Sequence, residues 1–199
     1  MSDEAMNPQR RRLLMLTTGL GVVGAAFAAT PFVKSMLPSA RARAAGAPVE
    51  VDISRLEPGQ LLTVEWRGKP VWILRRTPEM LQTLSAVEPM LADPESTVAD
   101  QQPKYAQNPT RSIKPEILVL VGLCTHLGCS PDKRLEPGAG SGLGADWPGG
   151  FFCPCHGSKF DLAGRVYRNV PAPTNMVVPP HAYINDTRIL IGEDQKETA

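Results

Sequence analysis

Six residues able to bind a metal fall into two short segments of the chain: all four cysteines and two of the three histidines. The segments read Cys124-Thr125-His126-Leu127-Gly128-Cys129 and Cys153-Pro154-Cys155-His156-Gly157-Ser158. Each supplies one cysteine and one histidine at close spacing, together with one further cysteine. Thiolate and imidazole are common ligands of zinc, copper and iron. Because random placement would rarely gather these residues, the pattern predicts a metal centre formed by two loops.

Structural zinc is the simplest interpretation of such ligands. Zinc sites with two cysteines and two histidines usually take them as separate Cys–Cys and His–His pairs. Here each segment mixes the two residue types, and a site with four ligands leaves two cysteines over. An oxidising compartment joins spare thiols into disulfides, so free ones are rare in an exported domain. A structural zinc module therefore remains an alternative, although it accounts for these residues less completely.

The two segments resemble the loops of Rieske iron–sulfur proteins, which read Cys-x-His-x-Gly-Cys and Cys-x-Cys-His-x-Ser. Further parts of the family pattern lie at residues 111–116, 149–152, 161, 164–165 and 171–173. The resemblance is strongest to the proteobacterial iron–sulfur subunits of ubiquinol–cytochrome c reductases. It implies an all-β, antiparallel Rieske-type domain with a cluster-binding subdomain, tethered to one N-terminal transmembrane helix.

The resemblance also implies the residues of the site. One [2Fe–2S] cluster is expected, and its implied ligands are Cys124 and Cys153 on one iron and His126 and His156 on the other. Cys129 and Cys155 are expected to form a disulfide.

Other residues are expected around the cluster by the same resemblance. His156 is the ligand expected to face the quinol, and Leu127 and Gly128 lie in the apolar tip. Ser158 stands where the family places a hydroxyl donor to a bridging sulfide. At Phe160 many relatives carry a tyrosine that donates to a cysteine sulfur, so a lower reduction potential is expected here.

The mixed ligand set suits a centre of high potential. Two ferric ions, two sulfides, two thiolates and two neutral imidazoles carry no net charge, whereas four thiolates would make the site a dianion. Adding an electron to a neutral site costs less. Rieske centres accordingly lie at about −150 to +300 mV, against about −400 mV for four-cysteine clusters of the plant type.

The resemblance implies an electron carrier that works as a subunit of an oxidoreductase. It would accept one electron, and a proton at a ligand histidine, from ubiquinol beside a b-type cytochrome subunit. It would pass the electron to a c-type cytochrome subunit of the same membrane complex, which is expected to be dimeric. The small Rieske subunit of arsenite oxidase is a second alternative, beside the zinc module.

An apolar segment precedes this body. Residues 13–33 contain no charge, and a helix of that length spans about 30 Å, the thickness of a bilayer's hydrocarbon core. Arginines at 10–12 predict a cytoplasmic N-terminus, and the resemblance implies a periplasmic body on the inner membrane. They also fit a twin-arginine signal, with a plain signal-anchor as the alternative. Cleavage near residues 40–42 is less favoured, because the run exceeds the roughly 7–15 residues of a signal-peptide core.

The chain therefore divides into four expected parts. They are a basic N-terminus at 1–12, a transmembrane anchor at 13–33, a flexible hinge of small residues at 34–48, and a periplasmic Rieske domain at 49–199. The net charge of +1 and the 6% of aromatic residues argue against nucleic-acid binding.

The body reads as mostly β-structure with many turns, since the chain contains 17 glycines and 20 prolines. Thr77-Pro78 predicts the start of a helix over 78–86. Residues 91–112 and 130–150 are expected to be loops. The expected strands are 49–53, 61–66, 70–75, 117–121, 165–167, 176–178, 181–184 and 188–191. The three tryptophans and His181 are expected to pack rather than to contact a cofactor.

Overall fold

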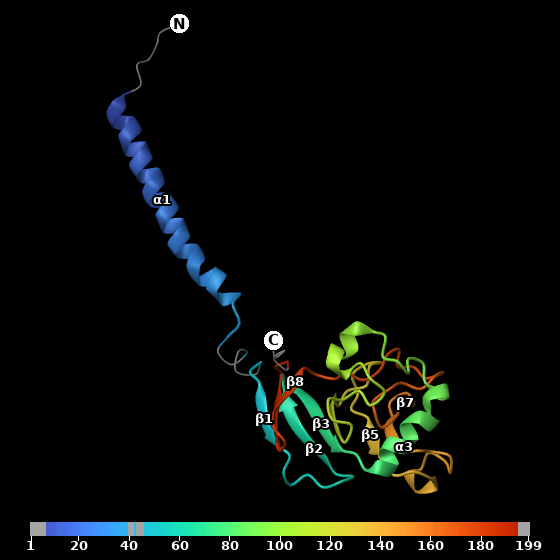
Figure 1. Cartoon of the computed structure of the whole chain (residues 1–199). Coiled ribbons are helices and arrows are strands. Elements are labelled where there is room, and N and C mark those ends of the chain that lie inside the picture. The colour runs from blue at the N-terminus through green and yellow to red at the C-terminus, as the bar shows by residue number, and fades with distance from the viewer. Residues whose placement is uncertain (1–6, 40–41, 43–45, 195–199) are drawn as a thin grey trace. The chain divides into compact units, whose positions relative to one another are not determined.

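The structure is a computed structural model, and it describes residues 7–39, 42 and 46–194 (Figure 1). The chain forms two compact units, residues 1–44 and 45–199. The predicted hinge at 34–48 and the predicted basic N-terminus at 1–12 lie partly outside the described residues, as does the cleavage site near 40–42.

The first unit contains one long helix, α1 (Pro8–Ser35), which is long and apolar enough to cross a membrane. Asn7 caps its first turn by accepting a hydrogen bond from the backbone N–H of Gln9 at 3.0 Å. The hydroxyls of Thr17 and Thr30 donate to the carbonyls of Leu13 and Ala26 one turn earlier. Such bonds satisfy a hydroxyl where no water is available, so these threonines are compatible with a membrane helix.

The second unit contains three antiparallel sheets of three strands each, in the orders β1-β9-β8, β2-β3-β4 and β5-β6-β7. The strands are β1 (Val49–Asp52), β2 (Leu61–Trp66), β3 (Lys69–Arg75), β4 (Ile117–Val121), β5 (Asp132–Arg134), β6 (Gly150–Cys153), β7 (Ser158–Phe160), β8 (His181–Asn185) and β9 (Arg188–Ile191). The helices are α3 (Pro78–Ala86) and four short 3₁₀ turns, η1 (Glu88–Met90), η2 (Ala99–Gln101), η3 (Lys104–Ala106) and η4 (Ala139–Ser141).

The central sheet delivers the chain to the first cysteine segment. Arg67 and Gly68 both have positive φ, which makes the tight two-residue turn between β2 and β3. Strand β4 pairs with β3 and is buried at every residue, as its apolar sequence predicts. Because β4 is held on both faces, the chain leaves it in a fixed direction toward Cys124.

Two hydrophobic cores lie in this unit. One is formed around β1, β9 and one face of the β2-β3-β4 sheet, and includes Val51, Ile73 and Ile191. The other includes Trp72, Leu120, Phe151 and Phe160, together with Cys124 and Cys153. The second core therefore joins the central sheet to the β5-β6-β7 sheet and contains two thiols. Helix α3 packs there through Leu84, and its N-cap is Thr77 as predicted.

The predicted fold class is confirmed, but two predicted strands are wrong. Residues 165–167 make only isolated bridges, because the side-chain oxygen of Asn175 accepts a hydrogen bond from the backbone N–H of Val166 at 2.8 Å. Residues 176–178 form no strand, because their backbone bonds go to three separate segments, at Gly164, Val121 and Gln101. The loop predicted at 130–150 contains the unpredicted strand β5, since residues 132–134 pair with β6.

Candidate metal centre

The two cysteine–histidine segments occupy equivalent positions at the ends of strands. The first follows β4 after two residues, and the second is the loop of the β6–β7 hairpin. Cys153 ends β6 and pairs with Ser158, which begins β7. Both segments therefore start from rigid sheet, and this fixes the direction in which their side chains leave.

The two loops also share a backbone turn. The N–H of Gly128 donates to the carbonyl of Cys124 at 3.0 Å, and the N–H of Gly157 donates to that of Cys153 at 2.9 Å. These glycines have φ of 81° and 79°, in the left-handed region that other residues rarely adopt. Each loop therefore closes back on its own first cysteine and projects the histidine between them outward.

Two thiols lie at the inner side of the site. Cys124 and Cys153 are free, at 3% and 2% exposed, and they lie close enough for Cys153 to influence the Cys124 thiol. Burial raises the pKa of the Cys124 thiol above its ordinary value, and the neighbouring Cys153 adds to the effect. A bound metal cation reverses this preference, because it stabilises thiolates. Two adjacent buried thiols thus suit a cation held between the loops.

Two imidazoles lie at the outer side. The rings of His126 and His156 meet edge to face, with their centroids 4.7 Å apart. His156 is exposed and His126 is partly exposed, while Leu127 between the cysteines of its loop is 72% exposed. The predicted residue Gly128 is also exposed. The site is therefore asymmetric, with two thiols toward the core and two imidazoles toward solvent.

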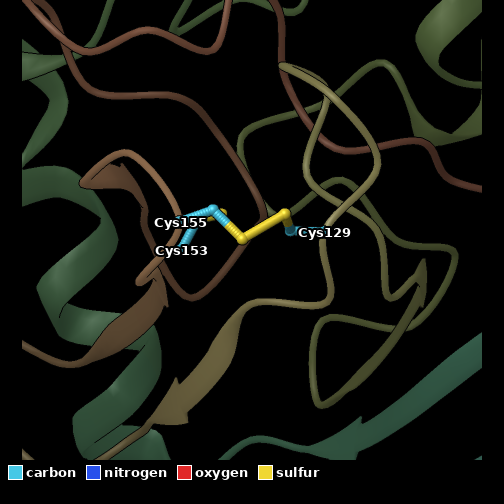
Figure 2. Close-up of side chains that lie close together, drawn as sticks. All are labelled: Cys129, Cys153 and Cys155. Atoms are coloured by element: carbon cyan, nitrogen blue, oxygen red, sulfur yellow. A yellow bond between two sulfur atoms is a disulfide. The ribbon is translucent and has the colours of Figure 1, made fainter.

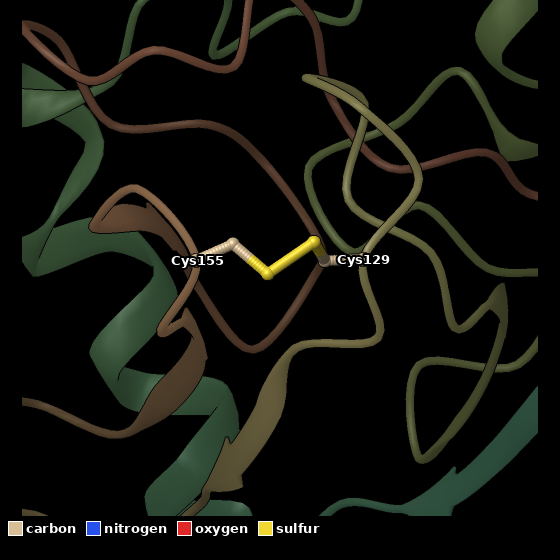
Figure 3. The surroundings of a disulfide bond; sticks show 2 residues. All are labelled: Cys129 and Cys155. Carbon is tan, nitrogen blue, oxygen red and sulfur yellow. A yellow bond between two sulfur atoms is a disulfide. The ribbon is translucent and has the colours of Figure 1, made fainter.

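The remaining cysteines join the two loops. Cys129 and Cys155 form a disulfide, as predicted (Figure 3). Their sulfur atoms and that of Cys153 lie within 4.8 Å of one another (Figure 2). A disulfide sulfur is not a thiolate, so of these three only Cys153 offers a ligand for iron. The disulfide fixes one loop against the other at the edge of the site.

A third segment, residues 172–174, closes the site. The hydroxyl oxygen of Ser158 accepts from the backbone N–H of Ala172 at 3.0 Å. The hydroxyl of Thr125 donates to the carbonyl of Thr174 at 2.7 Å. Because its oxygen accepts the Ala172 bond, Ser158 keeps its own proton available to donate, and it lowers the pKa of the Cys124 thiol against the larger effect of burial. The sequence pointed to residues 171–173 only through resemblance, and their contact with both loops was missed.

Aromatic side chains fill the core beneath the thiols. Phe151 and Phe160 are fully buried and lie opposite each other on β6 and β7. Trp72 stacks on Phe151 with the ring centroids 5.2 Å apart. Trp66 and Trp147 are also buried, and His181 is a fully buried packing residue on β8. The expectation that the tryptophans and His181 serve packing fits their burial.

A comparison with known protein families shows which family the chain belongs to. Residues 48–181 match the family model described as "Rieske [2Fe-2S] domain". The chain belongs to the Rieske iron–sulfur family. Residues 1–39 match the model described as "Ubiquitinol-cytochrome C reductase Fe-S subunit TAT signal", which confirms the predicted twin-arginine signal. The cofactor of this Rieske domain is a [2Fe–2S] cluster, as predicted, and a structural zinc module is no longer needed to explain the cysteines.

Two relatives of this chain have the same name. The chain is 65% identical over 196 residues to the ubiquinol–cytochrome c reductase iron–sulfur subunit of Allochromatium vinosum, covering 98% of this chain and 94% of that one. It is 42% identical to the subunit of the same name from Blastochloris viridis, over 96% of each chain. A chain of the solved structure "Hyperthermophilic respiratory Complex III" is 27% identical, with a TM-score of 0.48, covering 88% of this chain and 97% of that chain.

Proposed function

We propose that the chain is the electron-carrying iron–sulfur subunit of a ubiquinol–cytochrome c reductase. The observation that carries the proposal is the 65% identity over nearly the full length of both chains. Two loops that present two buried thiols and two outward imidazoles support it. The proposed ligands are Cys124 and Cys153 on one iron and His126 and His156 on the other.

The donor set fits the cluster chemically. The two free cysteines are the buried pair, whereas the exposed side of the site holds the disulfide and the histidines. When bound, a [2Fe–2S] cluster with two thiolate and two imidazole ligands supplies a one-electron carrier at the potentials given above. Around it, the Ser158 hydroxyl is available to donate to sulfur, and Phe160 excludes water without offering a donor.

The exposed histidine gives the chain its part in quinol oxidation. A neutral imidazole that ligates a metal carries its proton on the ring nitrogen away from the metal. This nitrogen accepts a proton from a hydroxyl only after it has lost that one, and a bound cation makes it easier to lose. His156 is exposed, so this ring is accessible to a quinol hydroxyl. The exposed Leu127 side chain supplies an apolar contact for the quinone pocket of a partner. His156 would therefore orient the quinol and take its proton as the electron leaves.

We infer the wider arrangement from the N-terminal segment. Residues 1–12 would stay in the cytoplasm, 13–33 would span the inner membrane, 34–48 would act as a hinge, and 49–199 would lie in the periplasm. Helix α1 and the twin-arginine signal support a single-pass anchor. The b-type and c-type cytochrome subunits would be the partners, ubiquinol the substrate, and the whole complex a dimer.

Spectroscopy of membranes containing the full chain tests this proposal. Iron and acid-labile sulfide are expected in equal amounts, two of each per chain, with nitrogen hyperfine coupling from two histidines in the reduced-state EPR signal. His126→Gln and His156→Gln should each abolish that signal. His181→Gln is the matched control, because it removes a histidine from the same domain outside the proposed site. A single bound zinc ion, or nitrogen coupling that survives in both ligand variants, would refute the assignment.

A further inference from the structure

Three arginines are buried in the second unit, and we call them with their acidic partner the arginine cluster: Arg76, Arg111, Arg165 and Asp161. None of the four is more than 2% exposed. Arg165 pairs with Asp161 at 2.7 Å between Nε and Oδ2. Asp161 is the only carboxylate among them, so the arginine cluster holds two positive charges in excess.

Arg76 and Arg111 bind neutral partners. Arg76 donates to three backbone carbonyls and to the hydroxyl of Ser112. Arg111 donates to three carbonyls and to the amide oxygen of Gln102. Neither forms an ion pair within the part of the chain that the structure describes. Besides Asp161, the exposed Glu116 acts on Arg76 from a distance, and the half-buried Asp93 acts on Arg111.

Both guanidinium groups remain charged at neutral pH. Burial lowers the pKa of Arg76 and of Arg111 to about 10, with the nearby Arg165 acting in the same direction and Asp161 opposing. A pKa of about 10 still leaves each group protonated at pH 7. Buried charge without a paired anion is costly, and such a cost persists where it serves a function or is offset elsewhere.

The arginine cluster shares the apolar core with the thiols. The carbonyls that Arg76 and Arg111 bind include those of Leu162, Ala163 and Gly164, in the turn that follows β7. Leu162 and Ala163 belong to the same buried core as Cys124 and Cys153. The two guanidinium groups are therefore bonded to the backbone of the apolar core that contains the thiols, and charges act further through an apolar core than through solvent.

We propose that Arg76 and Arg111 raise the reduction potential of the cluster through their buried positive charge. The proposal rests on the proposed function, since it takes Cys124 and Cys153 as iron ligands. Reduction adds one electron, and hence one negative charge, to a site that is neutral when oxidised. Two fixed cations in the adjoining core stabilise that added charge, so the reduced form is favoured.

Redox titration of the full chain, followed by EPR, tests the charge directly. Arg76→Gln and Arg111→Gln each remove a positive charge, and each should lower the midpoint potential. Asp161→Asn removes the negative charge and should raise it. The shift in midpoint potential should thus have opposite signs in the aspartate and arginine variants. Lost packing would not raise the potential in one variant and lower it in the others.

Two controls separate burial from charge. Arg168→Gln removes an exposed arginine of the same domain, so solvent should screen its effect and the potential should stay close to that of the unchanged chain. Asp161→Asn with Arg165→Gln removes a buried pair without changing the net charge, and should shift the potential less than Arg111→Gln does.

The outcomes are distinct. Unchanged potentials in Arg76→Gln and Arg111→Gln, or shifts of one sign in all three single variants, would overturn the proposal. If a glutamine variant binds no iron–sulfur cluster, the Asp161→Asn variant tests the proposal instead. A raised midpoint potential in that variant supports the proposal, and an unchanged one overturns it. Loss of the cluster in all three would mean that these residues serve the fold alone. An unchanged chain without a Rieske EPR signal would instead refute the proposed function.

Discussion

The disulfide between Cys129 and Cys155 should contribute a large part of the stability of the second unit. It closes a loop of 26 residues between the two cluster segments. In the chain-entropy description, a cross-link over such a loop destabilises the unfolded state by about 3.5 kcal/mol at 25 °C. Domains of this size are stable by only about 5–15 kcal/mol. We therefore expect the double variant Cys129→Ser, Cys155→Ser to keep its fold with a much smaller margin.

Urea unfolding of the iron-free full chain measures this loss. All three tryptophans are buried in the second unit and none lies in α1, so their fluorescence reports on the unit that contains the disulfide. With urea slopes of about 1–3 kcal/mol per molar, the midpoint should fall by more than about 1 M. A phosphine reductant should lower the midpoint of the unchanged chain equally and leave the double variant unaffected. Equal midpoints for the two chains without reductant would refute the reasoning.

Three further predictions concern single residues. A Cβ at Gly150 would lie 2.2 Å from the Phe160 carbonyl oxygen, so Gly150→Ala should cost more than about 2 kcal/mol of unfolding free energy, whereas Gly140→Ala, which meets nothing, should cost little. Phe160→Tyr should raise the midpoint potential in a redox titration by adding a donor near the thiols, and no rise would contradict this. Burial lowers the pKa of His181 from its ordinary 6.5, so below that pH the unfolded chain binds a proton that the folded chain does not. The free energy of unfolding should therefore decrease as the pH is lowered, by at most about 1.4 kcal/mol per pH unit. In His181→Gln the urea midpoint should depend less on pH between pH 7.5 and 5.5.

Much of the fold followed from local patterns. The hairpin around Arg67 and Gly68, the capped helix after Thr77 and the buried run 117–121 form as predicted. Their signals are turn residues, caps and side-chain periodicity, all of which act between near neighbours. The predicted strands at 165–167 and 176–178 failed because their backbone groups bond to Asn175 and to three distant segments. Strand propensity carries no information about such partners.

The burial of Arg76 had only a weak sequence signal. It follows directly after the buried strand β3, where a charged residue would ordinarily turn to solvent. Its partners at 110–116 and 162 are far along the chain, so only folding brings them to it.

The sequence alone determined the types of the proposed ligands, their division into two loops and the apolar length of the N-terminal helix, because these depend on covalent spacing and side-chain chemistry. Which cysteines pair and which stay free was indicated only by the resemblance to a known family. The tertiary structure buries Cys124 and Cys153 as free thiols, joins Cys129 to Cys155, and turns both histidines outward. Burial and long-range contacts arise only when β4, the β6–β7 hairpin and residues 172–174 meet, and no single segment encodes that meeting.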